Sequence, residues 1–163
     1  MTDEFVVNFD DVEDTEFDNT PVPPGWYRVM VDSYSEEYGN GNEIVIKRKD
    51  GKLPEGTKGT SWAFKIVDDD KHDGRMIWAT YWHHGKTVGF WKTLYKASGV
   101  FVDGELAEDM DLLNERERVV GAEMWAQLKV TKSKDYEPKN DIRTLKHLDE
   151  RKAKAAASTG LMP

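Results

Sequence analysis

The chain has no cysteine, no long hydrophobic run and no basic residue among its first 20 positions. The absence of cysteine excludes disulfides and thiolate metal sites. No apolar stretch approaches the roughly 20 residues that cross a bilayer, and the acidic first residues differ from the basic start of a signal peptide. With 163 residues, one domain can bury a core without covalent support. We therefore expect a cytoplasmic protein that makes no membrane contact.

The net charge of −8 is concentrated at one end of the sequence. Residues 1–20 carry eight acidic side chains, whereas the remaining chain balances 23 acidic against 23 basic residues. We expect an acidic flexible tail at 1–20, a folded domain at 21–148 and a C-terminal tail at 149–163. The phenylalanines of the acidic tail, Phe5, Phe9 and Phe17, are candidates for docking a partner protein. A solubilising leader and a first strand of the domain are alternative interpretations of the same segment.

The spacing of apolar residues indicates a fold dominated by β-structure. Alternation of apolar and polar residues predicts five strands, at 26–33, 60–68, 75–84, 123–131 and 140–148. Apolar residues three and four apart predict one helix at 86–98, with Gly99 as its C-cap. A long loop with a small hairpin is expected at 35–58, and a short helix or packed loop at 103–118.

The order of three strands, a helix and two strands predicts an all-β fold with one helix. The specific expectation is an OB-fold-like, five-stranded Greek-key barrel in which the helix closes one end. An SH3-like barrel and a small β-sandwich have compatible numbers of strands.

Aromatic and basic residues in the folded domain indicate a surface for single-stranded nucleic acid. The domain holds 15 of the 18 aromatic residues, more than a small barrel buries easily. In an OB barrel, ligands bind the face of the second and third strands, between the loops that join strands one to two and four to five. Both loops are basic here, and Tyr81 or Trp82 must face outward on the third strand. The candidate DNA-binding residues are Arg28, Lys47, Arg48, Lys49, Lys65, Tyr81, Trp82, Trp125, Lys129, Lys132, Lys134, Tyr136, Lys139 and Arg143.

Signals for catalysis are weak. Adjacent His83 and His84 point to opposite faces of a strand, so they cannot both bind one metal. The aspartates at 68–70 and 73 lack the spacing and terminal glutamate of an EF-hand loop. The sequence has no phosphate-binding loop, dinucleotide fingerprint or nucleophile elbow. We expect no enzymatic activity, no cofactor and no metal site.

Short motifs spread over residues 3–148 resemble a family of phage-encoded proteins. The acidic leader is followed by PPGWYRV at 23–29, FKIVD at 64–68, GR at 74–75, KASG at 96–99, VG at 120–121 and YEPKN at 136–140. The family occurs among replication and recombination genes and was long catalogued as a domain of unknown function. The resemblance implies an OB-like fold that binds and protects single-stranded DNA without catalysis. The loop at 35–58 is longer than is usual in the family, and the position of Trp125 is commonly polar there.

Three functional hypotheses follow. The first is a single-stranded DNA-binding protein whose acidic tail competes for the groove or docks replication and recombination proteins. The second is an adaptor that recruits a recombinase or nuclease with little DNA binding. The third is an inhibitor that mimics DNA with its acidic tail. A homo-oligomer is compatible with each hypothesis.

Overall fold

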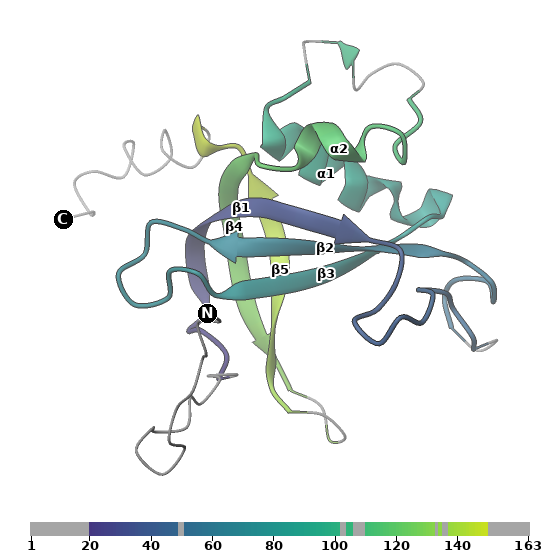
Figure 1. The fold of residues 1–163 in the computed structure, drawn as a ribbon, viewed down its shortest axis with the longest axis horizontal. Helices are drawn as coiled ribbons and strands as arrows, with labels where there is room; N and C mark the ends of the chain where they lie inside the picture. Colours follow the sequence, from purple (N-terminus) through teal and green to yellow (C-terminus); the bar gives the residue numbers. More distant parts are fainter. Residues whose placement is uncertain are drawn as a thin grey trace, which may run out of the picture.

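The fold is an antiparallel sheet of five strands with one main helix packed against it (Figure 1). A computed structural model describes residues 20–48, 51–101, 104–105, 110–132, 134 and 137–149. Its strands are β1 Gly25–Ser35, β2 Gly59–Ile66, β3 Met76–Trp82, β4 Glu123–Thr131 and β5 Lys139–Lys146. Its helices are the 3₁₀ turn η2 Gly85–Thr87, α1 Val88–Ser98 and the single turn α2 Arg116–Val119. The expectation of a β-rich fold with one main helix is confirmed.

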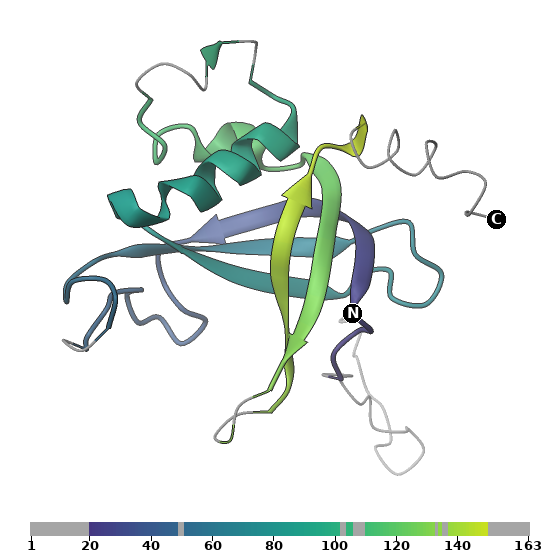
Figure 2. The same ribbon diagram turned by 180° about the vertical axis from the view of Figure 1, so that it is seen from behind.

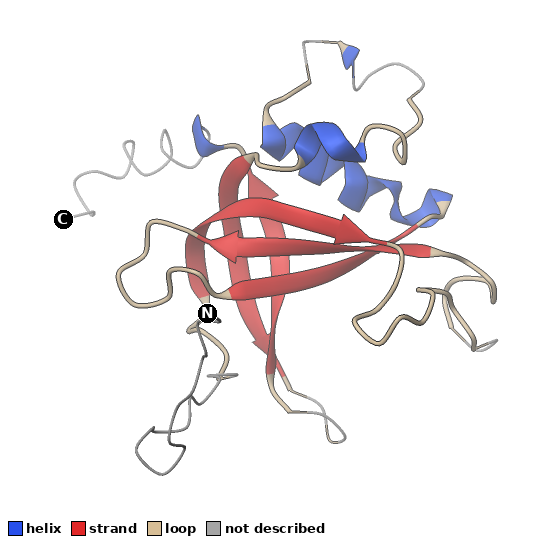
Figure 3. Cartoon of the chain, in the orientation of Figure 1, coloured by secondary structure: helices blue, strands red, loops and turns tan. Residues whose placement is uncertain are grey.

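The sheet has the strand order β3-β2-β1-β4-β5, with every neighbouring pair antiparallel. The two edge strands, β3 and β5, therefore run in the same direction. The sheet curls until these edges approach each other, as Figures 1 and 2 show from opposite sides. Figure 3 shows the helices gathered over one end of this curved sheet.

One face of the sheet and the helix α1 form the core. Cross-strand register places Phe64 of β2 between Val31 of β1 and Ile77 of β3, and all three side chains are buried. Trp91 of α1 packs edge-on against Trp62 of β2 at a ring-centroid distance of 6.0 Å. Alternation along the strands sends the intervening residues to the opposite face. That outward face is where a ligand can reach the sheet.

The long loop between β1 and β2 lies where the sequence analysis expects it. The described residues between β1 and β2, 36–48 and 51–58, have isolated β-bridges between Glu37 and Glu43 and between Val45 and Lys58. Ile44 of this loop is fully buried, so the loop is fastened to the domain rather than free of it. Within the described ranges, no helix is long and apolar enough to span a membrane.

Helix α1 ends where the sequence predicts. Gly99 adopts the left-handed conformation with φ 69°, and its N–H bonds to the carbonyl of Lys96. A Cβ atom at this position would lie 2.5 Å from Nε2 of His147, which follows β5. Gly99 therefore ends the helix and also permits close contact with the end of the sheet.

We expect the substitution Gly99→Ala to lower the free energy of unfolding by at least about 1–2 kcal/mol, because alanine disfavours a left-handed backbone and its methyl group would displace His147. Thermal unfolding followed by circular dichroism measures the change.

Gly89→Ala is the matched control within the same helix. A Cβ atom at Gly89 meets no atom within 4 Å, so alanine should stabilise the protein by about 0.5–1 kcal/mol. Equal effects of the two substitutions would contradict the role assigned to Gly99.

Candidate nucleic-acid interface

A broad groove crosses the outward face of β1, β2 and β3. Its volume is about 1260 Å³. The floor includes small side chains, since Ser61 and Ala63 of β2 lie opposite Thr80 and Trp78 of β3. The rims come from the start of the β1–β2 loop, the β2–β3 turn, Pro21 and the end of the β4–β5 loop. The groove thus lies between the two loops that the sequence analysis named.

Two aromatic rings line this groove and remain open to solvent. Trp78 on β3 is 62% exposed, and Tyr38 in the β1–β2 loop is 44% exposed. Most large apolar side chains of the described chain are instead buried against the core. A solvent-exposed indole on a strand offers a flat surface on which an unpaired base can stack.

The charges that line the groove are balanced. Arg75 and Lys139 contribute positive charge, and Glu37 and Asp141 contribute negative charge. Lys139 lies 3.9 Å from Asp141, a distance at which an exposed ion pair contributes little stability. Lys65 adds a partly exposed ammonium on the same face of β2. Stacking rather than charge should therefore dominate binding in the groove itself.

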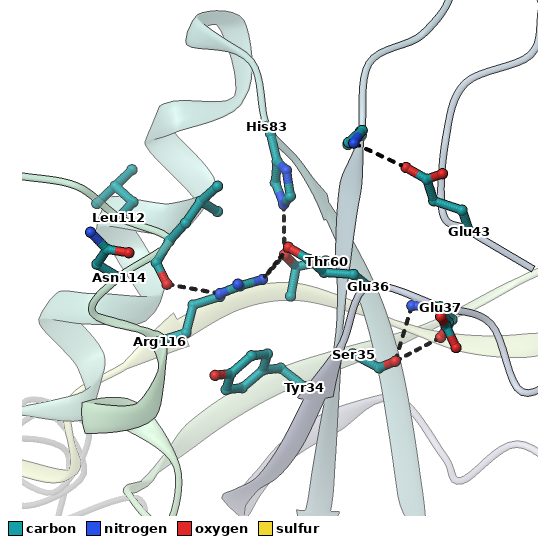
Figure 4. Close-up of polar contacts among 12 residues, drawn as sticks. Tyr34, Ser35, Glu36, Glu37, Glu43, Thr60, His83, Leu112, Asn114 and Arg116 are labelled. Carbon is teal, nitrogen blue, oxygen red and sulfur yellow. Dashed lines mark hydrogen bonds and ion pairs between the residues drawn. The ribbon is translucent and has the colours of Figure 1, made fainter. Parts of the chain in front are cut away.

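Arg116 fastens the loop that carries Tyr38 to the sheet (Figure 4). Its guanidinium donates to Oγ1 of Thr60 at 2.9 Å and to a carboxylate oxygen of Glu36 at 3.1 Å. It also donates to the carbonyl of Leu113 at 2.9 Å and lies 4.6 Å from the ring centroid of Tyr34. Glu36 begins the β1–β2 loop, so this ion pair holds the groove rim next to β2. The Arg116 side chain is only 13% exposed, whereas that of Glu36 is 57% exposed, so water partly screens the ion pair.

The same cluster includes His83, which follows β3. Oγ1 of Thr60 lies 2.7 Å from Nε2 of His83 and already accepts a hydrogen bond from Arg116. The tautomer of His83 sets the direction of this hydrogen bond, because the Thr60 oxygen can accept from Arg116 and still either donate to Nε2 or accept from it. Burial lowers the pKa of His83 below its ordinary value of 6.5, and the nearby Arg116 charge lowers it further.

The structure separates the two aromatic candidates at the end of β3. Tyr81 lies on the inward face, where its ring packs edge-on against Trp91 at 5.8 Å. Burial raises the pKa of Tyr81. Trp82 lies on the outward face with its ring close to Gly59 and Ile44. Of the two alternatives, Trp82 is the residue on the same side as Trp78.

Trp125 lies outside the groove. It is on the outward face of β4, half-buried, opposite Arg28 and Lys146. Its indole N–H donates to the carbonyl of Leu148 at 3.2 Å. In the sheet order, β1 and β2 separate Trp125 from the aromatic residues of β3. Arg28 forms ion pairs with Glu123 at 2.8 Å and Asp68 at 3.6 Å, so its charge is already partly neutralised.

The other candidates are spread over several parts of the surface. The exposed cations are Lys47, Arg48, Lys129, Lys132, Lys134, Lys139 and Arg143. Of these, Lys139 lines the groove, whereas Lys129 and Arg143 line a separate cleft between β3 and β5. Lys49, Tyr136, Phe5, Phe9 and Phe17 lie outside the described residues.

Trp78 and Tyr38 were not among the candidates that the sequence suggested. Trp78 could have been found, because strand alternation places it on the same face as Trp82. Tyr38 lies in a loop with no periodic pattern to assign its direction. Elsewhere His83 bonds to Thr60, and His84 accepts from the backbone N–H of Lys86 at 3.1 Å. Within the described part of the chain, no group of three or more His, Asp or Glu side chains could hold a metal ion.

Comparison of the chain with protein-family models and with curated proteins finds no match. The resemblance to the phage family therefore rests on the short motifs alone.

We expect the pKa of His83 to lie below 6.5, so that the neutral imidazole dominates at neutral pH. Because the folded-state pKa is lowered, the unfolded chain binds more protons in acid, and stability is lost as the pH falls through 6.5. Two-dimensional NMR of the imidazole nitrogens reports both the pKa and the tautomer.

His83→Gln provides the stability control, since a glutamine side chain can hydrogen-bond to Thr60 without titrating. The loss of melting temperature between about pH 7.5 and pH 5.5 should be smaller in this variant than in the original protein. An equal loss in both proteins would show that His83 does not contribute to the acid sensitivity.

Proposed function

We propose that the protein binds single-stranded DNA along the groove on β1, β2 and β3. The observation that carries this proposal is the pair of exposed rings, Trp78 and Tyr38, in a groove of about 1260 Å³ between two loops that bear cations. Unpaired bases stack on such rings with about 1–3 kcal/mol per base and little dependence on sequence. Lys65, Arg75 and Lys139 can contact the phosphates. The family resemblance extends this proposal. The protein would bind and protect DNA during phage replication or recombination, in the host cytoplasm.

The strand pairings support an OB-like barrel as the framework of the site. β1 pairs with both β2 and β4, the edges β3 and β5 run parallel, and α1 follows β3. An OB barrel has the same order of three strands, a helix and two strands, and its ligands bind on the β2–β3 face. We propose that the groove corresponds to that ligand-binding face.

We expect oligothymidine to quench the tryptophan fluorescence of the full chain. Trp78→Ala should weaken binding about tenfold, because one stacking platform is lost. The log–log salt slope should be negative but shallow, at about −0.7 for each phosphate neutralised, since the lining charges of the groove nearly balance.

Trp125→Ala is the matched control, with an indole removed from β4 instead of β3. It should leave the affinity unchanged under the groove proposal. The reverse pattern, with only Trp125→Ala weakening binding, would place the interface on the outward face of β4 and β5. No quenching at low salt by any oligonucleotide would refute DNA binding and favour the adaptor.

The acidic tail of the sequence analysis, here called the leader and taken as residues 1–19, joins the domain at the rim of the proposed binding groove. The carbonyl of Thr20 accepts a hydrogen bond from Arg75, and Pro21 lines the groove. Asn140 of β5 holds both backbone groups of the buried Val22, at 2.9 and 3.0 Å. A polyanionic segment tethered at this point has a high effective concentration at the groove. We propose that residues 1–19 compete with DNA for it and, when displaced, offer Phe5, Phe9 and Phe17 to partner proteins.

We expect deletion of residues 1–19 to tighten oligothymidine binding severalfold at low salt, with a smaller gain at high salt because screening weakens the competition. Fluorescence titration of the shortened chain, once its melting temperature matches that of the full chain, measures the change.

A second variant separates the effect of the leader's charge from the effect of its bulk. It keeps the full length of the leader and changes its eight acidic residues to Asn or Gln. This variant should tighten binding as much as the deletion does. Unchanged affinity in both variants would exclude competition, and binding of partners through the three phenylalanines would remain as the proposed role of the leader.

A further inference from the structure

A second cleft lies between the edge strands β3 and β5, next to the start of α1. Its volume is about 640 Å³. Thr80 and Asp141 line both this cleft and the groove on β1, β2 and β3, so the two hollows adjoin each other. The cleft exists because the edge strands approach each other without being neighbours in the hydrogen-bonded sheet. A ligand in the groove can therefore continue over Thr80 to the end of β3.

The residues that line the cleft suit an anionic ligand better than those of the groove do. Lys86, Lys129 and Arg143 are exposed cations at its edges, and Asp141 is the one carboxylate among the lining residues described. Lys86 comes from η2, whereas the other two cations come from β4 and β5. Three cations from three elements surround a path where a phosphate backbone can run.

The cleft also has an exposed aromatic ring. Phe90, in the first turn of α1, is 60% exposed. Its ring centroid lies 6.1 Å from that of Tyr81, which supports Phe90 from the core side. The ring is therefore held in position on one face and accessible to solvent. It gives the cleft the same combination of flat ring and nearby cations that single strands require.

We propose that the cleft between β3 and β5 is a second subsite for single-stranded DNA, which continues the strand bound in the groove. Phe90 stacks a base, and Lys86, Lys129 and Arg143 contact the flanking phosphates. This proposal rests on the proposed function, since the strand must first lie along Trp78. The excess of cations in the cleft favours a polyanion over a neutral peptide strand. The groove supplies stacking, and the cleft supplies most of the attraction for phosphates.

The two subsites can be separated by the length of the oligonucleotide. An oligothymidine of about four nucleotides should occupy the groove alone, whereas one of about twelve should reach the cleft. In the full chain, Phe90→Ala should weaken binding of the longer oligonucleotide about tenfold and leave the shorter one unchanged. Trp78→Ala should weaken binding of both.

Val88→Ala is the matched control for Phe90→Ala. Val88 is 43% exposed at the start of the same helix and does not line the cleft, so its removal should not change either affinity. The double substitution of Lys86 and Arg143 by Gln gives an independent measurement. It should reduce the magnitude of the salt slope by about 1.4 for the longer oligonucleotide only, at about 0.7 per phosphate contact.

The outcomes distinguish the subsite from the proposed function. Two results together refute the second subsite. Phe90→Ala behaves like Val88→Ala or weakens binding of both lengths equally, and the double variant keeps the original salt slope. Weaker binding by Trp78→Ala in the same series would still support the groove. If neither Trp78→Ala nor Phe90→Ala changes binding of either length, the groove and the subsite are both refuted.

Discussion

A single guanidinium connects most of the parts that shape the groove. Arg116 links the turn α2, the root of the β1–β2 loop at Glu36, and Thr60 on β2. Through Thr60 it is also coupled to His83 at the end of β3. A truncated side chain at Arg116 would remove this donor from the buried Thr60 and from the Leu113 carbonyl, and would leave Glu36 without its ion pair. The position of the loop that bears Tyr38 therefore depends on a residue outside the groove.

The curvature of the sheet explains why the candidate cations are divided between two hollows. The sheet curves until β3 and β5 approach each other, and the register shifts between Val31 and Ser33 of β1 and between Gln127 and Leu128 of β4 are of the kind that bends strands. The outward face of β2 and β3 becomes the floor of the groove, and the seam between the edges becomes the cleft. Ser61 and Ala63 have small side chains, so they project little into the groove. Trp78 of β3 consequently projects from the groove floor into solvent.

Local sequence patterns predicted the helix and strands well. The predictions that these patterns could not make have physical reasons. Alternation identified all five strands, and Gly99 identified the end of α1, because both signals involve neighbouring residues. Both faces of β3 carry aromatic side chains, so alternation alone did not decide between Tyr81 and Trp82. The core contacts of Tyr81 come from α1, and the sequence pattern does not encode that packing. Trp125 was correctly placed on an outward face, but its separation from β3 depends on the strand order.

Long-range contacts account for most of what the sequence did not reveal. The role of Arg116 requires contacts with residues 56 and 80 positions away. Its own segment, predicted as a short helix or packed loop, gave no sign of them. The start of the domain at the groove rim likewise depends on a hydrogen bond between Val22 and Asn140, 118 positions apart. No periodic pattern can indicate such pairs, because each is created by the folding of the whole sheet.

The clamp between Val22 and Asn140 has a geometric consequence for anything that binds the leader. It fixes the start of the domain beside β5, at the rim of the groove. Nineteen residues precede Thr20, and a fully extended chain of that length spans at most about 65 Å. Under the proposed function, a protein that held the leader would stay within that distance of a strand bound in the groove. In that arrangement the leader would link the partner to the domain without a dedicated interface between them.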